Sequence, residues 1–343
     1  TIRRAGAHQR PLIVLSNSAH LSVLIASIPL FRRFAPLVLG GLFLAFALTG
    51  FETIHAQTPS YLQAEDGSGD TPRGRVVEGQ SVSSDLLGRE IPYSVYLPPG
   101  YDRSQRSYPV VYLLHGFTDD ETAWVQFGEV QRAADRGIAD RTIPPMVIVM
   151  PDADSTWYIN DAAGAEPYED AMFREFIPAV EETYRIRSEA QFRGVAGLSM
   201  GGYGTLVWAM RHPDRFAAAA AFSAGIYTEE AMRTMPWERY RDPFATVFGG
   251  GEDPETRITE HFREHSPLHF ARTASVDSLR SVRWYIDCGD DDFLYEGNSR
   301  LHMILRDRDV PHEYRVRDGA HNWTYWRGHI GKGLAFIGES FHR

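Results

Sequence analysis

The sequence predicts an α/β fold in which helices cover both faces of a mainly parallel central sheet. From Arg75 onward, strand-like segments alternate with helix-like segments, which is typical of a chain of βα units. Several strand-like segments are continuous runs of apolar and β-branched residues, as expected for strands that are buried on both faces. The chain has 343 residues, of which 43% are hydrophobic and 23% charged, so it can bury a sizeable core.

The first strands are predicted where such runs occur, and a helix is predicted where apolar residues recur every three or four positions. The predicted strands in this part of the chain are "IPYSVYLP" (91–98), "YPVVYLLHG" (108–116) and "PPMVIVMPD" (144–152). The helix "EPYEDAMFREFIPAVEETYRI" (166–186) follows them and presents one apolar face.

The alternation continues to the end of the chain. The predicted strands are 191–197, 217–225, 281–289 and 311–319, and the predicted helices are 201–216, 295–310 and 322–341. Between Gly225 and Val282 the alternation lapses for longer than an ordinary connection. We therefore expect a lid-like insertion at about 226–281, lying over one end of the sheet. Residues 75–343 would then form one catalytic domain.

The N-terminal part of the chain differs from the rest. Residues 1–56 carry five arginines and one acid, and the apolar run "PLVLGGLFLAFAL" (36–48) is followed by a small residue at Ala56. This pattern indicates a signal peptide and export to the periplasm or the medium. The alternative is a retained N-terminal membrane segment, which would be the protein's contact with a membrane. Residues 57–74, rich in Gly, Ser, Pro and acids, are expected to be a linker.

Charge and cysteine content limit the possible partners. The formal net charge is −10, which argues against a nucleic-acid partner, because phosphate binding needs a basic face. The single cysteine, Cys288, cannot form an internal disulfide. The sequence leaves the oligomeric state open.

The pentapeptide "GLSMG" (197–201) indicates a serine nucleophile. It is a full G-x-S-x-G between a predicted strand and a predicted helix, which is the context that this motif requires. Gly197 and Gly201 allow a sharp, strained turn that exposes the Ser199 hydroxyl above the sheet edge. The alternative is that Ser199 has no catalytic role and is only a small residue in a tight strand-to-helix turn.

An oxyanion hole is expected beside this serine. The backbone N–H of Met200, the residue after Ser199, is one expected donor. The loop "HGF" (115–117) follows a buried strand, so Phe117 is expected to supply the second N–H. His115 is interpreted as a structural histidine that shapes this loop, because the base in this arrangement follows the serine along the chain.

The acid and the base should follow Ser199 in that order. The loop "DCGDDDFLY" (287–295) offers four carboxylates, of which Asp292 is our choice and Asp291 the main rival. His321, in the loop before the last helix, is the expected general base, and a buried carboxylate would fix its tautomer.

The sequence contains two further patterns with a possible functional reading. "HFREH" (261–265) matches the inverted zinc-protease motif, but Pro267 breaks the helix and no separate acidic ligand helix is evident. We expect a solvated lid helix there rather than a metal site. Trp124, Trp157 and Trp323 follow strand ends and are candidates for substrate binding, each with core packing as its alternative.

Taken together, these motifs resemble the putative esterase family of the α/β-hydrolase superfamily. The resemblance rests on "VYLPPGYD", "YLLHG", "MPDADSTWY", "GLSMGGYGTLVWAMRHPDRF", "SPLHFA", "DCGDDDFLYEGN" and "DGAHNWTYW", and it covers roughly residues 75 to 343. The family includes tributyrin esterases, feruloyl esterases and S-formylglutathione hydrolases, and mycolyltransferases are more distant relatives. The resemblance implies an α/β-hydrolase fold and a triad of Ser199, Asp292 and His321. It also implies an oxyanion hole at Phe117 and Met200.

The expected function is that of a serine esterase that hydrolyses a small acyl or feruloyl-type ester through an acyl-enzyme, with no metal or organic cofactor. One alternative is an acyltransferase that uses the same triad. Others are an S-formylglutathione hydrolase-like thioesterase and a non-catalytic binding protein on a hydrolase scaffold. The "DCG" sequence of the acid loop departs from the "DQG" usual in formylglutathione hydrolases, and Gly201 departs from the alanine of mycolyltransferases.

Overall fold

A computed structural model describes residues 73–341. The predicted signal or membrane segment (1–56) and all but the last two residues of the predicted linker lie outside the described residues. Among the helices of the described part, none has the length and apolarity needed to span a bilayer.

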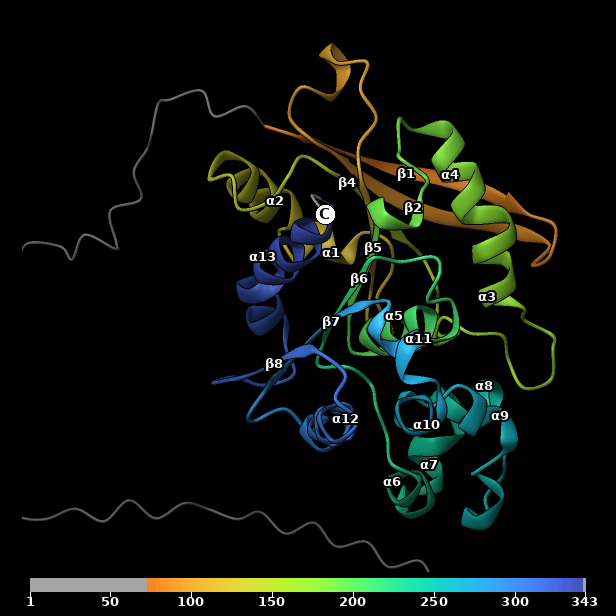
Figure 1. Ribbon diagram of the computed structural model, residues 1–343. Helices are drawn as coiled ribbons and strands as arrows, with labels where there is room; N and C mark the ends of the chain where they lie inside the picture. Colours follow the sequence, from red (N-terminus) through yellow and green to blue (C-terminus); the bar gives the residue numbers. More distant parts are fainter. Residues whose placement is uncertain (1–72, 342–343) are drawn as a thin grey trace, which may run out of the picture. The chain divides into compact units, whose positions relative to one another are not determined.

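The core of the fold is one eight-stranded sheet (Figure 1). Its strands, in sheet order, are β1 (Arg75–Ser84), β2 (Arg89–Leu97), β4 (Val147–Pro151), β3 (Val110–Leu114), β5 (Arg193–Leu198), β6 (Ala218–Phe222), β7 (Arg283–Gly289) and β8 (His312–Arg317). The first two pairings in this order are antiparallel and all the others are parallel. The predicted mainly parallel sheet is therefore confirmed.

The central strands are buried on both faces, which explains their continuous apolar sequences. Every residue of β3, β4, β5 and β6 is buried. β6 reads "AAAAF", and alanine on its own favours a helix. It forms a strand here between β5 and β7, where its small side chains let the covering helices approach the sheet closely. One such approach is at Gly333 of α13, which packs on Ala220 and Phe222.

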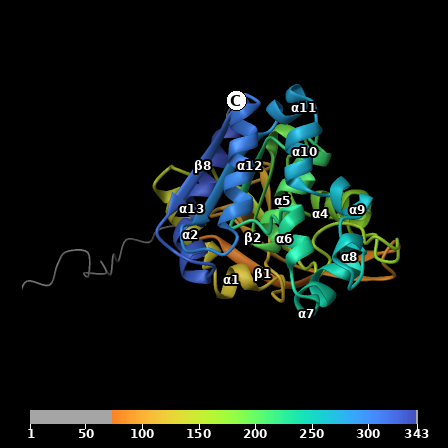
Figure 2. The ribbon, with the colours of Figure 1, turned by 90° about the horizontal axis from the view of Figure 1, so that it is seen from below.

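Helices lie on both faces of the sheet (Figures 1 and 2). On one face lie α2 (Val130–Ala139) and α13 (Trp323–Ser340), and α13 contributes Ile330, Leu334 and Ile337 to one core cluster. The opposite face carries the second core cluster beneath α5 (Met200–Arg211) and α12 (Tyr295–Asp307). Short pieces complete the connections: η1 (Tyr101–Arg103), α1 (Ala123–Gln126) and η3 (Ala190–Phe192).

The helix predicted over 166–186 forms in three consecutive parts. They are α3 (Tyr168–Ala171), a π-helical turn η2 (Met172–Phe176) and α4 (Ile177–Thr183). Pro178 at the start of α4 has no amide hydrogen to donate to the preceding turn, which accounts for the wider turn before it. The helix remains continuous, so its apolar face packs on the sheet as predicted.

The region predicted as an insertion is a set of short helical pieces on the side of α5 away from α2 and α13 (Figures 1 and 2). They are α6 (Glu229–Thr234), α7 (Trp237–Tyr240), η4 (Arg241–Ala245), α8 (Thr246–Phe248), η5 (Pro254–Thr256), α9 (Glu260–Glu264), α10 (Pro267–Thr273) and α11 (Val276–Arg280). α10 packs against both α5 and α12. The region is thus attached to the helical layer next to the sheet.

A cluster of side chains around the buried Glu169 attaches α9 to this layer. Glu169 is buried, and its carboxylate accepts hydrogen bonds from Arg211 (2.8 Å) and His212 (2.7 Å). His265 Nε2 lies 3.7 Å from the same carboxylate, and the His265 carbonyl accepts a hydrogen bond from the Tyr203 hydroxyl (2.8 Å). The expectation of a solvated helix at 261–265 is therefore wrong for His265, which is buried beside the Glu169 carboxylate.

The two histidines of the "HFREH" motif are engaged with the backbone. His261 Nε2 contacts the Asn160 carbonyl (3.0 Å), and His265 Nδ1 contacts the His261 carbonyl (2.8 Å). Glu264, the base that a zinc protease would need, is exposed. α9 ends at Glu264, ahead of Pro267, as the sequence predicts.

The buried position of His265 predicts acid-sensitive stability. Burial, with the charges of Arg211 and His261, lowers the pKa of His265 from 6.5 to about 4. Between these pH values the unfolded chain takes up a proton that the folded chain does not, so stability falls as the pH falls below 6.5. From pH 7 to pH 5 the cost is on the order of 2 kcal/mol. We expect His265→Gln to lose less thermal stability than the wild type over this interval.

His329 provides a matched control for this measurement. Its Nδ1 contacts the carbonyl of the residue four positions earlier, Tyr325 (2.7 Å), as His265 does, but it is only half-buried. Thermal midpoints of His329→Gln report the loss of such a contact alone. Parallel pH dependence of the wild type and His265→Gln would contradict the assignment.

Candidate active site

The candidate side chains come from neighbouring parallel strands at the edge where these strands end. Ser199 follows β5, Asp292 follows β7 and His321 follows β8. The "HGF" loop follows β3, which pairs with β5 in parallel. Because the carboxyl ends of parallel strands meet at one edge of a sheet, residues far apart in the sequence converge there.

Ser199 lies in a strained turn between β5 and α5. Its backbone angles are φ 53° and ψ −115°, a conformation that non-glycine residues rarely adopt. A Cβ at Gly197 would overlap the backbone of Gly201, and a Cβ at Gly201 would overlap the carbonyls of Leu114 and His115. The two glycines of the motif are therefore needed for close packing, as predicted.

Three side chains form a continuous hydrogen-bonded chain at this turn. His321 Nε2 lies 3.0 Å from Ser199 Oγ. On the other side of the ring, His321 Nδ1 lies 2.9 Å and 3.1 Å from the two carboxylate oxygens of Asp292. Because an ionised carboxylate only accepts, Nδ1 carries the proton and the free lone pair of Nε2 faces the serine hydroxyl.

The environment of Asp292 keeps its carboxylate ionised. The side chain is only 1% exposed, and burial by itself would raise its pKa. The hydrogen bond and charge of His321, the amide of Leu294 (2.9 Å) and the hydroxyl of Ser223 outweigh burial and hold the pKa of Asp292 below its usual value. The buried negative charge is thus balanced by donors on several sides.

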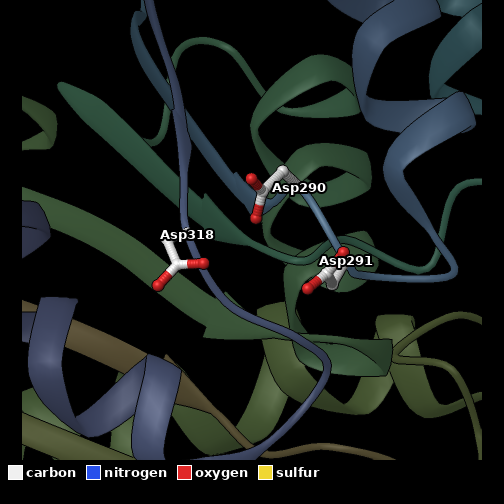
Figure 3. Close-up of side chains that lie close together, drawn as sticks. All are labelled: Asp290, Asp291 and Asp318. Atoms are coloured by element: carbon white, nitrogen blue, oxygen red, sulfur yellow. The ribbon is translucent and has the colours of Figure 1, made fainter.

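The other carboxylates of the same loop lie elsewhere. Asp290 and Asp291 are exposed and gather with Asp318 from the loop after β8 (Figure 3). Water screens their mutual repulsion, and the amide of Gly319 donates to Asp290 (3.0 Å). Of the two rivals left open by the sequence, the structure brings Asp292 to His321 and leaves Asp291 at the surface.

Asp287, the first carboxylate of the loop segment, is fully buried and does not contact His321 but joins neighbouring elements. It accepts hydrogen bonds from the hydroxyls of Tyr285 (2.7 Å) and Tyr325, and it pairs with Arg317. The cluster ties the end of β7 to the end of β8 and the first turn of α13. The loops that carry Asp292 and His321 are thereby fixed to each other.

His115 shapes the loop on the opposite side of Ser199. Its Nδ1 donates to the carbonyl of Gly116 (2.8 Å), and its Nε2 accepts from the amide of Ala153 (2.9 Å). A Cβ at Gly116 would lie 3.7 Å from the Ser199 Cβ, so this loop passes directly beside the serine. Met200 is the first residue of α5, where an amide has no partner within the helix.

Two of the three candidate tryptophans lie together near His321. Trp124 is buried, and its indole N–H donates to the Leu114 carbonyl (2.9 Å). Its ring packs edge-on against Trp323, at 5.2 Å between centroids, and Trp323 also contacts the exposed Phe127. Of this pair, Trp323 offers surface to a ligand and Trp124 supports it from behind.

Trp157 lies in an aromatic cluster on the other side of the serine. Its ring contacts Tyr203 and Phe244, with centroids 5.2 and 5.0 Å away. A small cavity here begins at Gly225, whose amide donates to the Ser199 carbonyl (2.8 Å). Most of the cavity wall comes from the insertion and the segment leading into it. It is lined by Trp157, Tyr203, Gly225, Tyr227, Met232, Phe248, Phe262, Ser266 and Pro267.

The backbone and the indole of Trp157 are both unusual. Trp157 and Tyr158 have positive φ angles of 57° and 63°. The Trp157 indole N–H is buried and has no hydrogen-bond partner among residues 73–341. Unpartnered buried donors and strained backbone are both costly, and they concentrate at functional sites.

Several residues around the site were missed by sequence reasoning. Phe293, 60% exposed, packs on the ring of His321 at 4.5 Å between centroids. Trp326 packs edge-on against the same ring from inside the protein, at 4.8 Å. Ser223 and Tyr227 follow β6, and only their position after a buried strand could have singled them out.

Comparison with known proteins identifies the family. The "Putative esterase" family model matches residues 84–337, so the chain belongs to the putative esterase family. It is 37% identical over 248 residues to an esterase of Mycobacterium tuberculosis, and the aligned region covers 66% of this chain and 52% of the relative. It is 33% identical over 184 residues to an endo-1,4-beta-xylanase/feruloyl esterase of Xylanibacter ruminicola, which covers 50% of this chain and 24% of that enzyme. The chain therefore spans about half and about a quarter of the length of these relatives.

Solved structures support the same family and confirm the predicted α/β-hydrolase fold. A ferulic acid esterase superimposes with a TM-score of 0.67 at 32% sequence identity. The match covers 78% of this chain and 99% of that structure.

The contacts of Asp292 predict which carboxylate of the loop matters for hydrolysis. Asp292→Asn keeps the shape of the side chain but removes the charge behind His321, so the ring loses its fixed tautomer. We expect kcat for p-nitrophenyl acetate to fall by about 10³- to 10⁴-fold. Asp291→Asn, at the adjacent exposed carboxylate, is the matched control and should stay near wild type. A milder effect for Asp292→Asn than for Asp291→Asn would overturn the assignment.

Proposed function

We propose that the protein is a carboxylic-ester hydrolase that works through a Ser199–His321–Asp292 triad and a covalent acyl-enzyme. The observation that carries the proposal is the pair of contacts of His321, 3.0 Å from Ser199 Oγ and 2.9 Å from Asp292. A base that reaches the nucleophile with one nitrogen and a buried carboxylate with the other has the geometry needed to activate a serine.

The chemistry follows from these contacts. His321 Nε2 takes the proton of the Ser199 hydroxyl as Oγ attacks the ester carbonyl, and Asp292 stabilises the imidazolium that forms. The same nitrogen then delivers the proton to the departing alcohol as the acyl–oxygen bond breaks. Water enters, loses a proton to His321 and attacks the acyl-enzyme, which releases the acid and restores Ser199.

The negative charge on the carbonyl oxygen is assigned to two backbone donors. These donors are the backbone amides of Phe117 and Met200. Phe117 belongs to the loop that passes beside Ser199, and Met200 is the first residue of α5. The His115 bonds to Gly116 and Ala153 hold that loop rigid, which keeps the donors preorganised. Positive potential at the start of α5 adds to the stabilisation.

The acyl group is assigned to the cavity at Gly225. Its wall is aromatic, which suits a planar acyl chain such as a hydroxycinnamoyl group, but its volume of about 10 Å³ means that the lining side chains must move apart to admit one. The free N–H of Trp157 would donate to an oxygen substituent on the acyl ring. Relatives named as a feruloyl esterase and a ferulic acid esterase support this substrate class. Trp323, backed by Trp124, is assigned to the alcohol.

Surface charge favours a neutral ester over a glutathione thioester. Asp290, Asp291 and Asp318 form an exposed acidic group on the loops that carry Asp292 and His321. Glutathione carries two carboxylates, and like charges near a site slow its association.

Loss of the serine hydroxyl tests the proposed reaction directly. We expect Ser199→Ala to lower kcat for p-nitrophenyl acetate by at least about 10³-fold, because no acyl-enzyme can form. Fluorophosphonate labelling should be lost as well, while Ser223→Ala should still be labelled. Near wild-type hydrolysis by Ser199→Ala would contradict the triad.

Product analysis with methyl ferulate and a competing alcohol completes this test. Hydrolysis yields free ferulic acid as the main product. Transesterified product ahead of free acid would instead identify an acyltransferase that uses the same triad.

The unpartnered indole of Trp157 predicts selectivity for oxygenated aromatic acyl groups. Trp157→Phe keeps an aromatic ring but removes the N–H. We expect kcat/KM for methyl ferulate to fall about tenfold, since a hydrogen bond contributes about 1–1.5 kcal/mol. Methyl cinnamate, which lacks ring oxygens, should be little affected. The control is Trp284→Phe, which removes an indole N–H bound to the Leu279 carbonyl outside the proposed site. Equal losses for both esters in Trp157→Phe would rule out the proposed contact.

A further inference from the structure

Trp326, on the first turn of α13, contacts both His321, the proposed base, and Ser223. It is 5% exposed, and its ring stands edge-on to His321, at 89° and 4.8 Å between centroids. Its indole N–H donates to the hydroxyl oxygen of Ser223 (3.0 Å). One buried side chain therefore packs against the proposed base and donates a hydrogen bond to the Ser223 hydroxyl.

Ser223 is held in a costly conformation directly after β6. It is fully buried and has a φ of 45°, which few residues other than glycine adopt. Its amide donates to the carbonyl of Asp287 (2.7 Å), which fixes the backbone there. Glycine would adopt this conformation without strain, so the serine side chain itself needs an explanation.

The hydroxyl of Ser223 has one proton to donate and a defined direction for it. Its oxygen is already accepting from Trp326, so its own proton points away from the indole. The Ser223 hydroxyl is also among the groups that hold the pKa of Asp292 below its usual value. The charged oxygen of Asp292 is a stronger acceptor than the neighbouring Cys288 thiol.

We propose that Ser223 and Trp326 are positioning residues for the Asp292–His321 pair. Trp326 directs the Ser223 hydroxyl toward Asp292 and holds the ring of His321 in the plane that links Asp292 to Ser199. This inference rests on the proposed function for its kinetic consequences. The geometry that it assigns can be measured without any substrate.

The substrate-free measurement is the proton NMR signal of the hydrogen between His321 Nδ1 and Asp292. This signal lies far downfield, and its loss in His321→Gln assigns it. Ser223→Ala and Trp326→Phe should both shift it, because Asp292 loses a donor or the donor loses its direction. Trp284→Phe is the matched control. It removes a buried indole hydrogen bond (2.6 Å to Leu279) near the start of β7, whereas Asp292 follows the end of that strand.

Kinetics on methyl ferulate test the consequence. Ser223→Ala and Trp326→Phe should each lower kcat about tenfold with KM little changed. The double variant should lose no more than the larger single variant, because the indole N–H acts through the hydroxyl. Independent, additive losses would overturn the proposed linkage.

Ser223→Gly separates positioning from stability. It removes the hydroxyl and also relieves the strained φ, so its thermal midpoint should equal or exceed that of the wild type. It should nevertheless show the NMR shift and the loss of kcat. An unshifted signal in Ser223→Gly and Ser223→Ala would refute the inference, whatever the substrate proves to be. A shifted signal in a protein that hydrolyses no ester would leave the positioning intact and remove the proposed function.

Discussion

The parallel register of β3, β5, β6, β7 and β8 is the constraint on which the rest of the structure depends. These strands are neighbours in the sheet and end at the same edge. Each end carries one part of the site, so side chains more than a hundred positions apart in the sequence meet within hydrogen-bonding distance. A shift of register would move Asp292 and His321 relative to Ser199, and no local rearrangement could compensate for both.

Several residues that pack closely at this edge of the sheet have a strained backbone. Ser199, Ser223, Trp157 and Tyr158 all have positive φ, and all follow strands of the sheet. Strained residues persist only where surrounding contacts determine them fully. Here those contacts come from the glycine turn of α5, the buried Asp287 cluster and the bonds of His115.

The insertion contributes to the site as well as to the surface. Its side chains form most of the wall of the cavity beside Ser199, and its helix α10 packs on α5, which begins at the nucleophile turn. The buried cluster of Glu169, Arg211, His212 and His265 attaches it to the same layer. The shape of this cavity is thus coupled to the packing of the helices behind the serine.

The sequence by itself determined the fold class and the strands that carry the candidate site, and it singled out the serine and the histidine of the proposed triad, because these depend on local patterns. Alternation of apolar runs predicts parallel strands, and G-x-S-x-G between a strand and a helix predicts a strained turn. Only the tertiary structure shows which of the adjacent carboxylates Asp291 and Asp292 is buried against His321. It also decided the buried role of His265, where a local helical pattern suggested a solvated face. Ser223, Trp326 and the unpartnered indole of Trp157 became visible only in three dimensions, because their importance lies in contacts between distant segments, which no spacing in the chain records.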